Sequence, residues 1–314
     1  MKYAIIGAGG TGGSLGAYLT NGGLDVTLIA RGAHLQAIQA DGLTVDRTWL
    51  SGTDGEFLTV PVKAAAPEAY QALRAPDRPD VVFVCVKSYS LESILPLLRA
   101  ITDSHSIVIP ILNVYGTGAR LQEQLPYCLV TDGCIYVSAG IQSPGRLFQT
   151  GSILRVVYGV RDAAEFRPAL ETIQSELNGC GVSAVLSDNI RRDALEKFSY
   201  VSPIGIAGLY YGATAGDFQR EGKERELFKA MILEITALAG KMGLRFERDL
   251  VEKNLEILAS LSPDSTTSMQ RDIAEGRPSE LDGLLFDVLR LGRQYGVELP
   301  CYQMAADRLS AYLK

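Results

Sequence analysis

The segment YAIIGAGGTG, residues 3–12, decides the fold, because an apolar run ends in glycines that open a helical pattern. Gly7, Gly9 and Gly12 have G-x-G-x-x-G spacing directly after this predicted strand. In such a unit the first glycine permits a tight turn, the second lets the backbone approach a pyrophosphate, and the third allows close helix–strand packing. The segment predicts a dinucleotide site formed by Gly7, Gly9, Gly10, Thr11 and Gly12. The alternative is a glycine-rich turn without a ligand, since the chain contains 32 glycines.

Outward from this segment, short apolar runs alternate with helical stretches. The runs DVTLIAR (25–31), DVVFVCVKS (80–88) and SIVIPILN (106–113) are typical of strands buried on both faces of a parallel sheet. The stretches GGSLGAYLTNGG (12–23) and SLESILPLLRAIT (90–102) have a helical pattern. We therefore predict an α/β fold with an N-terminal, Rossmann-type, doubly wound parallel sheet. Residues 128–160 indicate later strands, with a turn at Ser143-Pro144-Gly145.

The character of the chain changes after about residue 187. From there nearly everything has a helical pattern, with breaks at GATAGD (212–217), SLSPDST (260–266) and AEGRPSE (274–280). We place the boundary near Leu186. This gives an α/β domain over residues 1–186 and a C-terminal all-helical domain over residues 187–314.

Composition excludes several classes of protein. The net charge is −6 and no stretch concentrates Lys and Arg, so no nucleic-acid partner is expected. The five cysteines form no CxxC pair, which argues against a disulfide scaffold and against a metal site. The apolar runs are too short for a membrane span or a signal-peptide core. We expect a soluble, cytoplasmic protein.

The residue at the end of the second predicted strand selects the dinucleotide. An NAD site places an acidic residue about 20 positions after the glycines, where it binds the ribose hydroxyls. This chain has Arg31 at that place, in LIARGAH, and no acid beside it. A guanidinium there pairs with a 2′-phosphate, so we expect NADP(H) as the cofactor. The alternative is that Arg31 is a solvated charge at a strand end.

Reduction of a carbonyl also requires a proton donor. The Tyr-x-x-x-Lys pair of short-chain dehydrogenases is absent, and we expect His34 and His105 to be surface residues rather than acids. Lys197, in DALEKFSYVSP (193–203), shares a helical face with small and apolar residues such as Ala194 and Val201. Its ammonium either reaches out to water or lies beside a cleft, where it binds an anionic substrate and donates a proton.

At this point several segments together resemble one family. They are AIIGAGGTGGSLGAYL, Arg31, VCVKSYS, LNVYGTG, NIRRDALEKF, TAGDF and the long C-terminal TSMQRDIAEGRPSELDGLLFDVLRLGRQYGVELP. Their order and spacing are similar to those of the ketopantoate reductases (2-dehydropantoate 2-reductases) over nearly the whole chain.

The resemblance implies NADPH-dependent reduction of a 2-oxo acid, ketopantoate to pantoate, in pantothenate and coenzyme A biosynthesis, and it is compatible with a homodimer. Lys197 matches the catalytic lysine and Glu280 the glutamate that holds the substrate hydroxyl. Ser268 matches the serine near the substrate carboxylate. Asn113 matches an asparagine beside nicotinamide and substrate, and Lys87 a lysine on the cofactor side.

Each of these residues also fits an ordinary structural role when the family is left aside. Ser268 fits a helix N-cap and Glu280 a first-turn acid that complements a helix dipole. Asn113 fits a turn, and Lys87 an ordinary charge at a strand end.

The chain also departs from the family pattern. Family asparagines are replaced by Val201, Gly205 and Ala215, and Val114 stands where a glycine would let the backbone approach the ligand. A small polar substrate would leave unpaired polar groups there, at about 1–3 kcal/mol each. Two alternatives to ketopantoate reduction therefore stay open. One is a related dehydrogenase for a less polar 2-oxo or hydroxy acid, and the other is a non-catalytic NADPH-binding protein.

Overall fold

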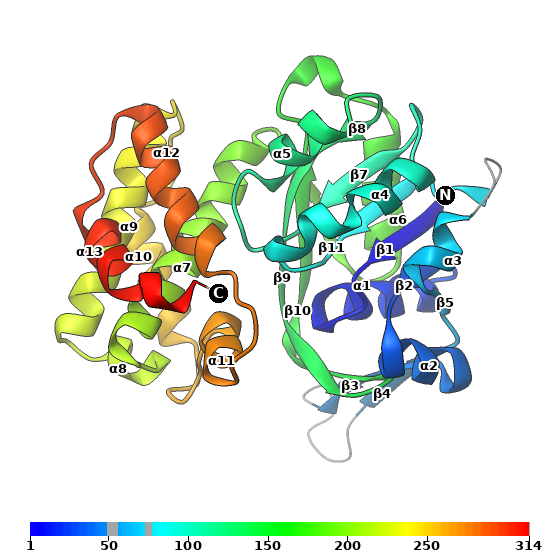
Figure 1. Ribbon diagram of the computed structural model, residues 1–314, viewed down its shortest axis with the longest axis horizontal. Helices are drawn as coiled ribbons and strands as arrows, with labels where there is room; N and C mark the ends of the chain where they lie inside the picture. The colour runs from blue at the N-terminus through cyan, green and yellow to red at the C-terminus, as the bar shows by residue number, and fades with distance from the viewer. Residues whose placement is uncertain (49–55, 73–76, 314) are drawn as a thin grey trace. The chain divides into compact units, whose positions relative to one another are not determined.

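The structure, a computed structural model, describes residues 1–48, 56–72 and 77–313. The chain packs into two units, each with its own core. Residues 1–112 and 116–190 form the first, which we call the sheet unit. Residues 113–115 and 191–314 form the second, which we call the helical unit. Figure 1 shows the elements of both.

A six-stranded, all-parallel sheet organises the sheet unit, in the order β5-β2-β1-β6-β7-β8. Its strands are β1 (Lys2–Ile6), β2 (Asp25–Ile29), β5 (Lys63–Ala65), β6 (Val81–Val84), β7 (Ile107–Pro110) and β8 (Leu129–Val130). Its helices are α1 (Gly10–Asn21), α2 (Gly32–Asp41), α3 (Pro67–Gln71), α4 (Leu91–Ile101), α5 (Thr117–Gln124) and α6 (Ala169–Gly179).

Alternate side chains of the central strand supply two separate cores, as the two-residue period of a strand requires. In β1, Tyr3 and Ile5 join the core that contains apolar residues of α1 and α6. Ala4 and Ile6 join the core formed with α4 and α5. Because both faces are covered, β6 and β7 are apolar and buried throughout, and the predicted doubly wound parallel sheet is confirmed.

A second, mixed sheet completes this unit: its two long strands lie in the region 128–160, where later strands were predicted, but the separate sheet and its strands β3 and β4 were not predicted. Its strands are β3 (Leu43–Arg47), β4 (Glu56–Val60), β9 (Asp132–Ser143), β10 (Arg146–Gly159) and β11 (Ser183–Leu186). The order is β11-β10-β3-β4, with β9 antiparallel to β10. The β9–β10 hairpin turns at Pro144-Gly145, inside the predicted turn, and Gly145 has φ +75°.

The helical unit is built around α9, which contacts four other helices. Its helices are α7 (Ile190–Tyr211, whose first residue belongs to the sheet unit), α8 (Ala215–Gln219), α9 (Lys223–Lys241), α10 (Leu250–Ala259), α11 (Ser268–Ala274), α12 (Asp287–Tyr295) and α13 (Pro300–Leu309), with a π-helical turn over Asp282–Phe286. The carboxylate of Glu234, on α9, accepts from the backbone N–H groups of Cys301 and Tyr302 at 2.6 and 3.2 Å. It thereby satisfies donors that the start of α13 would otherwise leave unpaired.

The predicted breaks between helices are confirmed. Helix α7 ends before Gly212, which has φ +67°, the left-handed conformation with which glycine commonly ends a helix. Helix α10 ends just before SLSPDST, and α11 ends at Ala274, ahead of Gly276. These ends fix the loops around the residues considered next.

Candidate active site

The predicted cofactor residues lie at one edge of the parallel sheet. Ile6, at the end of β1, pairs in register with Ile29 of β2 and Val84 of β6. The glycines begin directly after Ile6, while Arg31 and Lys87 follow the ends of β2 and β6 within three residues. The chain adds β2 and then β5 on one side of β1 and returns to place β6 on the other. Ligands of open α/β sheets bind outside the carboxyl ends of the strands at such a switch point.

The glycines of this edge differ in what surrounds them. Gly7 has φ +101°, and a Cβ there would stand 3.0 Å from the backbone of Cys85. A Cβ on Gly12 would stand 2.1 Å from the Gly7 carbonyl oxygen. A Cβ on Gly9 would meet nothing within 4 Å. The chain's own packing therefore requires Gly7 and Gly12, whereas Gly9 exposes backbone at the start of α1, as a pyrophosphate requires.

Gly10 and Thr11 form the first turn of α1. A Cβ on Gly10 would stand 2.4 Å from the carbonyl oxygen of Ala139, so the hairpin strand β9 runs directly against this helix end. The described backbone thus fits a dinucleotide at the N-terminus of a 12-residue helix. The contacts of these residues to NADP(H) stay a prediction.

His34 has a role that the sequence did not suggest. Its Nε2 donates to the carbonyl oxygen of Ala8 at 2.8 Å, and its Nδ1 accepts from the N–H of Gly145 at 3.0 Å. Because a carbonyl only accepts and a backbone N–H only donates, these partners fix the neutral tautomer with the proton on Nε2. The half-buried imidazole ties the glycine loop to the turn of the β9–β10 hairpin. No sequence signal links residues 8, 34 and 145.

Arg31 at this edge, and His105 at the opposite edge of the sheet, keep the positions expected from the sequence. Arg31 is exposed and directly precedes α2, in extended conformation. His105 is exposed in the turn before β7, as predicted. Whether Arg31 binds a phosphate or is only a solvated charge stays open.

In the helical unit the structure brings two predicted site residues together. Lys197 Nζ, on α7, donates to Asn113 Oδ1 at 2.9 Å, although 84 residues separate them along the chain. Both side chains are partly buried. The amide oxygen holds the ammonium in place, and this bond accounts for one of its three N–H donors. The lysine on a small and apolar helix face is therefore anchored by a polar partner.

Pro203 removes one backbone hydrogen bond from α7, the helix that carries Lys197. Proline has no N–H, so the carbonyl of Ser199, four residues earlier, loses its helical donor. Asn254, on α10, replaces it: Nδ2 donates to Ser199 O and to Ser199 Oγ, both at 3.0 Å. Ser199 and Asn254 are almost completely buried. One residue earlier on α10, Lys253 forms an ion pair with Glu196, the neighbour of Lys197. Helix α10 thus braces α7 on both sides of the lysine.

Glu280 is buried, with 3% of its surface exposed, and its carbonyl oxygen accepts from the N–H of Leu284 at 2.9 Å. The turn that follows it is π-helical, a form frequent at functional sites. Ser202 Oγ, on α7, donates to the Leu284 carbonyl oxygen at 2.7 Å and lies 2.6 Å from the hydroxyl of Tyr302. The segment that begins at Glu280 is thereby fastened to α7.

The same π-helical turn accounts for Val114. A Cβ on Gly283 would stand 2.5 Å from Val114 Cγ2, so the valine side chain packs against a glycine. Val114 is 5% exposed and belongs to the core of the helical unit. Its effect on the approach of a ligand to the backbone stays a prediction. The contact between Val114 and Gly283 holds residues 113–114 against the π-helical turn that follows Glu280.

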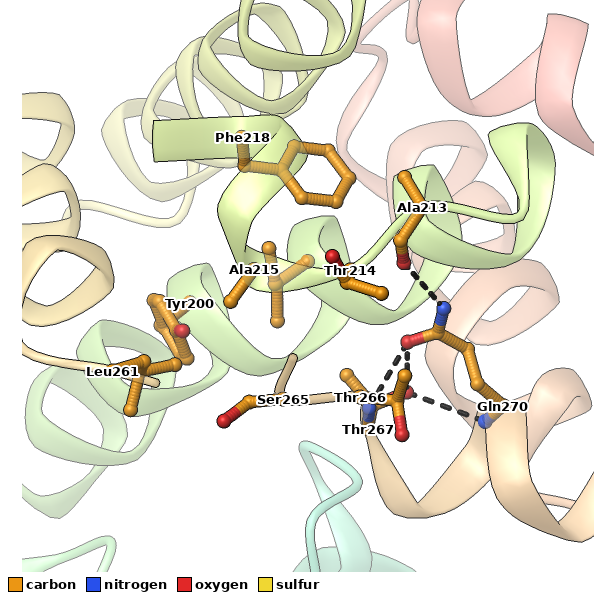
Figure 2. Close-up of a pocket in the computed structure, with 11 residues that line it drawn as sticks. Tyr200, Ala213, Thr214, Ala215, Phe218, Leu261, Ser265, Thr266, Thr267 and Gln270 are labelled. Carbon is orange, nitrogen blue, oxygen red and sulfur yellow. Dashed lines mark hydrogen bonds between the residues drawn. The ribbon is translucent and has the colours of Figure 1, made fainter. Parts of the chain in front are cut away.

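Ser268 is the first residue of α11, but it is not the N-cap. Thr267 is the cap, in a capping box with Gln270. Thr267 Oγ1 accepts from the Gln270 N–H at 3.3 Å, and Gln270 Oε1 accepts from the Thr267 N–H at 3.0 Å, as Figure 2 shows. An N-cap role for Ser268 is therefore wrong, and its role toward a substrate carboxylate stays a prediction.

Among residues 1–48, 56–72 and 77–313, no cluster of His, Cys, Asp and Glu is arranged to hold a metal ion. Over the same ranges, no helix has the length and apolar character needed to cross a membrane. The five cysteines form no disulfide. Burial raises the pKa of Cys128 to about 11, so its thiol is protonated and unreactive at neutral pH.

A parallel sheet with an open glycine turn, joined to a helical unit with an anchored lysine, defines a two-part, dinucleotide-dependent oxidoreductase. A family model described as "Ketopantoate reductase PanE/ApbA" matches residues 3–163, and its C-terminal counterpart matches residues 189–313. The chain therefore belongs to the ketopantoate reductase family, and it is an NADP-dependent oxidoreductase that acts on CH–OH groups.

Individual relatives cover the chain almost completely. A 2-dehydropantoate 2-reductase of Mesorhizobium japonicum is 29% identical over 312 residues, 93% of this chain and 92% of the relative. A 2-dehydropantoate 2-reductase structure from Methylococcus capsulatus has a TM-score of 0.85 at 20% identity, covering 99% of this chain and 96% of that one. A D-mandelate dehydrogenase in a ternary complex with NADH and anilino(oxo)acetate has a TM-score of 0.84 at 21% identity, with 99% and 98% covered. The solved structures share the fold.

Proposed function

We propose that the protein reduces a 2-oxo acid with NADPH, and that ketopantoate, reduced to pantoate for pantothenate and coenzyme A biosynthesis, is the first substrate to test. The observation that carries the proposal is the hydrogen bond from Lys197 to Asn113. An ammonium held in a fixed position by the Asn113 amide oxygen can donate another of its N–H groups to a carbonyl oxygen. Family membership supports the reaction class.

In this proposal each unit has its own task. Residues 1–186 bind NADP(H): the glycine turn takes the pyrophosphate, Arg31 pairs with the 2′-phosphate, and Lys87 lies on the cofactor side. When bound, the cofactor supplies the hydride. Residues 187–314, together with Asn113, bind the substrate.

Within the substrate-binding part the residues divide the work. Lys197 donates a hydrogen bond or proton to the substrate carbonyl oxygen, and Asn113 orients the ammonium. Glu280 holds a substrate hydroxyl, and Ser268 lies toward the carboxylate.

A second candidate is a related dehydrogenase for a less polar 2-oxo or hydroxy acid. The side chains of Val201 and Ala215 and the bare backbone of Gly205 offer no amide to such a ligand. Gly205 lies on the buried side of α7, where a Cβ would come within 3.3 Å of Met269. Substrate hydroxyls that depend on amides at these positions would lose their partners. A third candidate, a non-catalytic NADPH-binding protein, would not need Lys197 or Glu280.

The decisive experiment follows loss of NADPH absorbance with purified protein and ketopantoate, and repeats it with Lys197→Ala. We expect turnover by the wild type and a loss on the order of 10²–10⁴-fold in kcat for the variant. Lys241→Ala, at an exposed lysine in the last turn of α9, is the matched control and should change nothing. Tight NADPH binding without turnover of any 2-oxo acid would favour the non-catalytic alternative.

Two further parts of the proposal have separate measurements. A homodimer formed through the helical unit would appear in sedimentation equilibrium as twice the chain mass of 33.9 kDa. A cytoplasmic location stays a prediction, and cell fractionation checks it.

A further inference from the structure

Two buried hydroxyl groups, those of Ser202 on α7 and Tyr302 on α13, form a short hydrogen-bonded chain in the core of the helical unit. Ser202 Oγ donates to the Leu284 carbonyl oxygen at 2.7 Å and lies 2.6 Å from the Tyr302 hydroxyl oxygen. Both residues have 0% of their surface exposed, so water does not reach either hydroxyl. The proposed reaction gives neither of them a task.

The direction of both hydrogen bonds follows from the chemistry of the groups. A carbonyl oxygen only accepts, and a serine hydroxyl has a single proton. The proton of Ser202 is therefore directed to Leu284, and the Tyr302 O–H is the donor to Ser202 Oγ. Burial raises the pKa of Tyr302 above its ordinary value, so the phenol keeps this proton. The phenol thus fixes the rotation of the serine hydroxyl, and the serine hydroxyl holds the Leu284 carbonyl.

Each end of the chain is anchored to a different part of the unit. At one end, the Glu234 carboxylate on α9 accepts from the backbone N–H groups of Cys301 and Tyr302, which holds the start of α13. At the other end, the N–H of Leu284 donates to the Glu280 carbonyl oxygen at 2.9 Å. Leu284 lies inside the π-helical turn, a rare form of backbone, and the bond from α7 holds this turn from outside.

The chain also joins the turn after Glu280 to the helix that carries Lys197. Ser202 follows Lys197 by five residues on α7, about 7.5 Å along the helix axis. Leu284 follows Glu280 by four residues. The hydrogen bond from Ser202 to Leu284 therefore connects the backbone segments that carry the predicted proton donor and the predicted hydroxyl-binding carboxylate.

We propose that Ser202 and Tyr302 are positioning residues, which set the carboxylate of Glu280 at the substrate hydroxyl by holding the π-helical turn against α7. This inference rests on the proposed function and adds two residues to it. Both are fully buried, so they act through Glu280 rather than on a ligand. A misplacement of about 1 Å at a group that orients the substrate can cost on the order of 10²-fold in rate, so the loss of this bond is measurable.

The test compares ketopantoate with 3,3-dimethyl-2-oxobutanoate, the same acid without its hydroxyl, in NADPH-dependent reduction. If Glu280 holds the hydroxyl, the wild type prefers ketopantoate by on the order of 10²-fold or more in kcat/KM. Ser202→Ala should lower this preference by about 10-fold or more, with kcat/KM for the deoxy acid close to wild type. Tyr302→Phe keeps the bond from Ser202 to Leu284 and should lower the preference less.

Three further variants separate positioning from loss of stability. Ser202→Cys keeps a weak donor and nearly the same shape, so it should recover part of the preference. In a Glu280→Gln background, Ser202→Ala should lower the preference no further, because both changes act through position 280. Ile232→Val, at a fully buried position of α9, destabilises the core without removing a hydrogen bond and should leave the preference unchanged. Urea unfolding and NADPH binding check that each variant is folded. If Ser202→Ala does not fold, Tyr302→Phe and Ser202→Cys decide.

The outcomes separate the two ideas. If the wild type reduces no 2-oxo acid, the proposed function fails and this inference fails with it. If both acids are reduced but Ser202→Ala lowers kcat/KM for both alike, or changes neither, the positioning role is overturned and the reductase stands. A wild type that reduces 2-oxo acids without preferring ketopantoate also overturns it, as does an effect of Ser202→Ala that persists in Glu280→Gln.

Discussion

The carbonyl of Ser199 depends on Asn254 because Pro203 cannot donate to it, and this dependence can be tested in a double-mutant cycle. Asn254→Leu removes the donor while approximately keeping side-chain volume. Pro203→Ala restores a backbone N–H four residues after Ser199. In the Pro203→Ala background the helix itself can supply the bond, so the loss of Asn254 should matter much less.

The magnitude follows from burial. Ser199 has 0% and Asn254 1% of its surface exposed, so in Asn254→Leu no water replaces the lost donor. An unsatisfied buried carbonyl costs about 1–3 kcal/mol, and the bond to Ser199 Oγ is lost as well. We therefore expect Asn254→Leu to lower the free energy of unfolding by about 1–3 kcal/mol with Pro203 present. In the Pro203→Ala background, the cost should fall by at least about 1 kcal/mol.

Urea unfolding followed by far-ultraviolet circular dichroism measures all four members of the cycle. Lys253→Met is the control on the same helix: it breaks the ion pair to Glu196 but should show no coupling to Pro203. If Asn254→Leu costs the same in both backgrounds, within about 0.5 kcal/mol, the assignment of Asn254 as the replacement donor is wrong.

Three other perturbations have clear expected outcomes. Gly9→Ala should weaken NADPH binding but change the free energy of unfolding by no more than about 0.5 kcal/mol. Gly10→Ala should weaken binding and also destabilise the fold by about 1–3 kcal/mol, because its Cβ meets the Ala139 carbonyl. Fluorescence titration measures the binding, and urea unfolding measures the stability. His34→Phe should weaken NADPH binding on the order of 10-fold, and His34→Gln should recover part of it; equal affinity in all three would contradict the bracing role. Burial raises the pKa of Tyr200 to about 12, so its contribution to stability is complete below the ordinary phenol pKa of about 10 and is lost as pH rises through about 12. The difference in free energy of unfolding between the wild type and Tyr200→Phe, measured at alkaline pH, should show this fall.

The sequence predicted those parts of the fold that depend on local pattern. The strands around the glycine turn are uniformly apolar because both faces of the sheet are buried, so their pattern was decisive. The helices that end at Tyr211, Ala259 and Ala274 stop just before breaker residues. The hairpin strands of the second sheet were predicted, but the sheet itself was missed, because pairings such as β3 with β10 join segments about 100 residues apart and depend on register rather than on composition.

In the candidate site, too, the sequence predicted what a local pattern shows and missed the contacts between residues distant in sequence. Lys197 was singled out because a charge on a small, apolar helix face conflicts with its surroundings, and Asn113 entered only through the family resemblance. Their hydrogen bond, like the contacts of His34 and Asn254, joins residues that are distant in sequence, and no local pattern encodes it. The roles of Arg31, Lys87, Ser268 and Glu280 toward ligands stay predictions.

The contact between Val114 and Gly283 has a consequence for the order in which this site can change. A Cβ added at position 283 would stand 2.5 Å from Val114 Cγ2, so the buried valine would have to shift. A larger residue at position 283 therefore requires that Val114 is first replaced by a smaller residue. The protein with the smaller residue at 114 and glycine still at 283 has a void in its core. If position 283 were enlarged first, the new side chain would overlap Val114 and strain the core. Positions 114 and 283, 169 residues apart, thus have to change together, and any mutant library meant to reshape this region should randomise both at once.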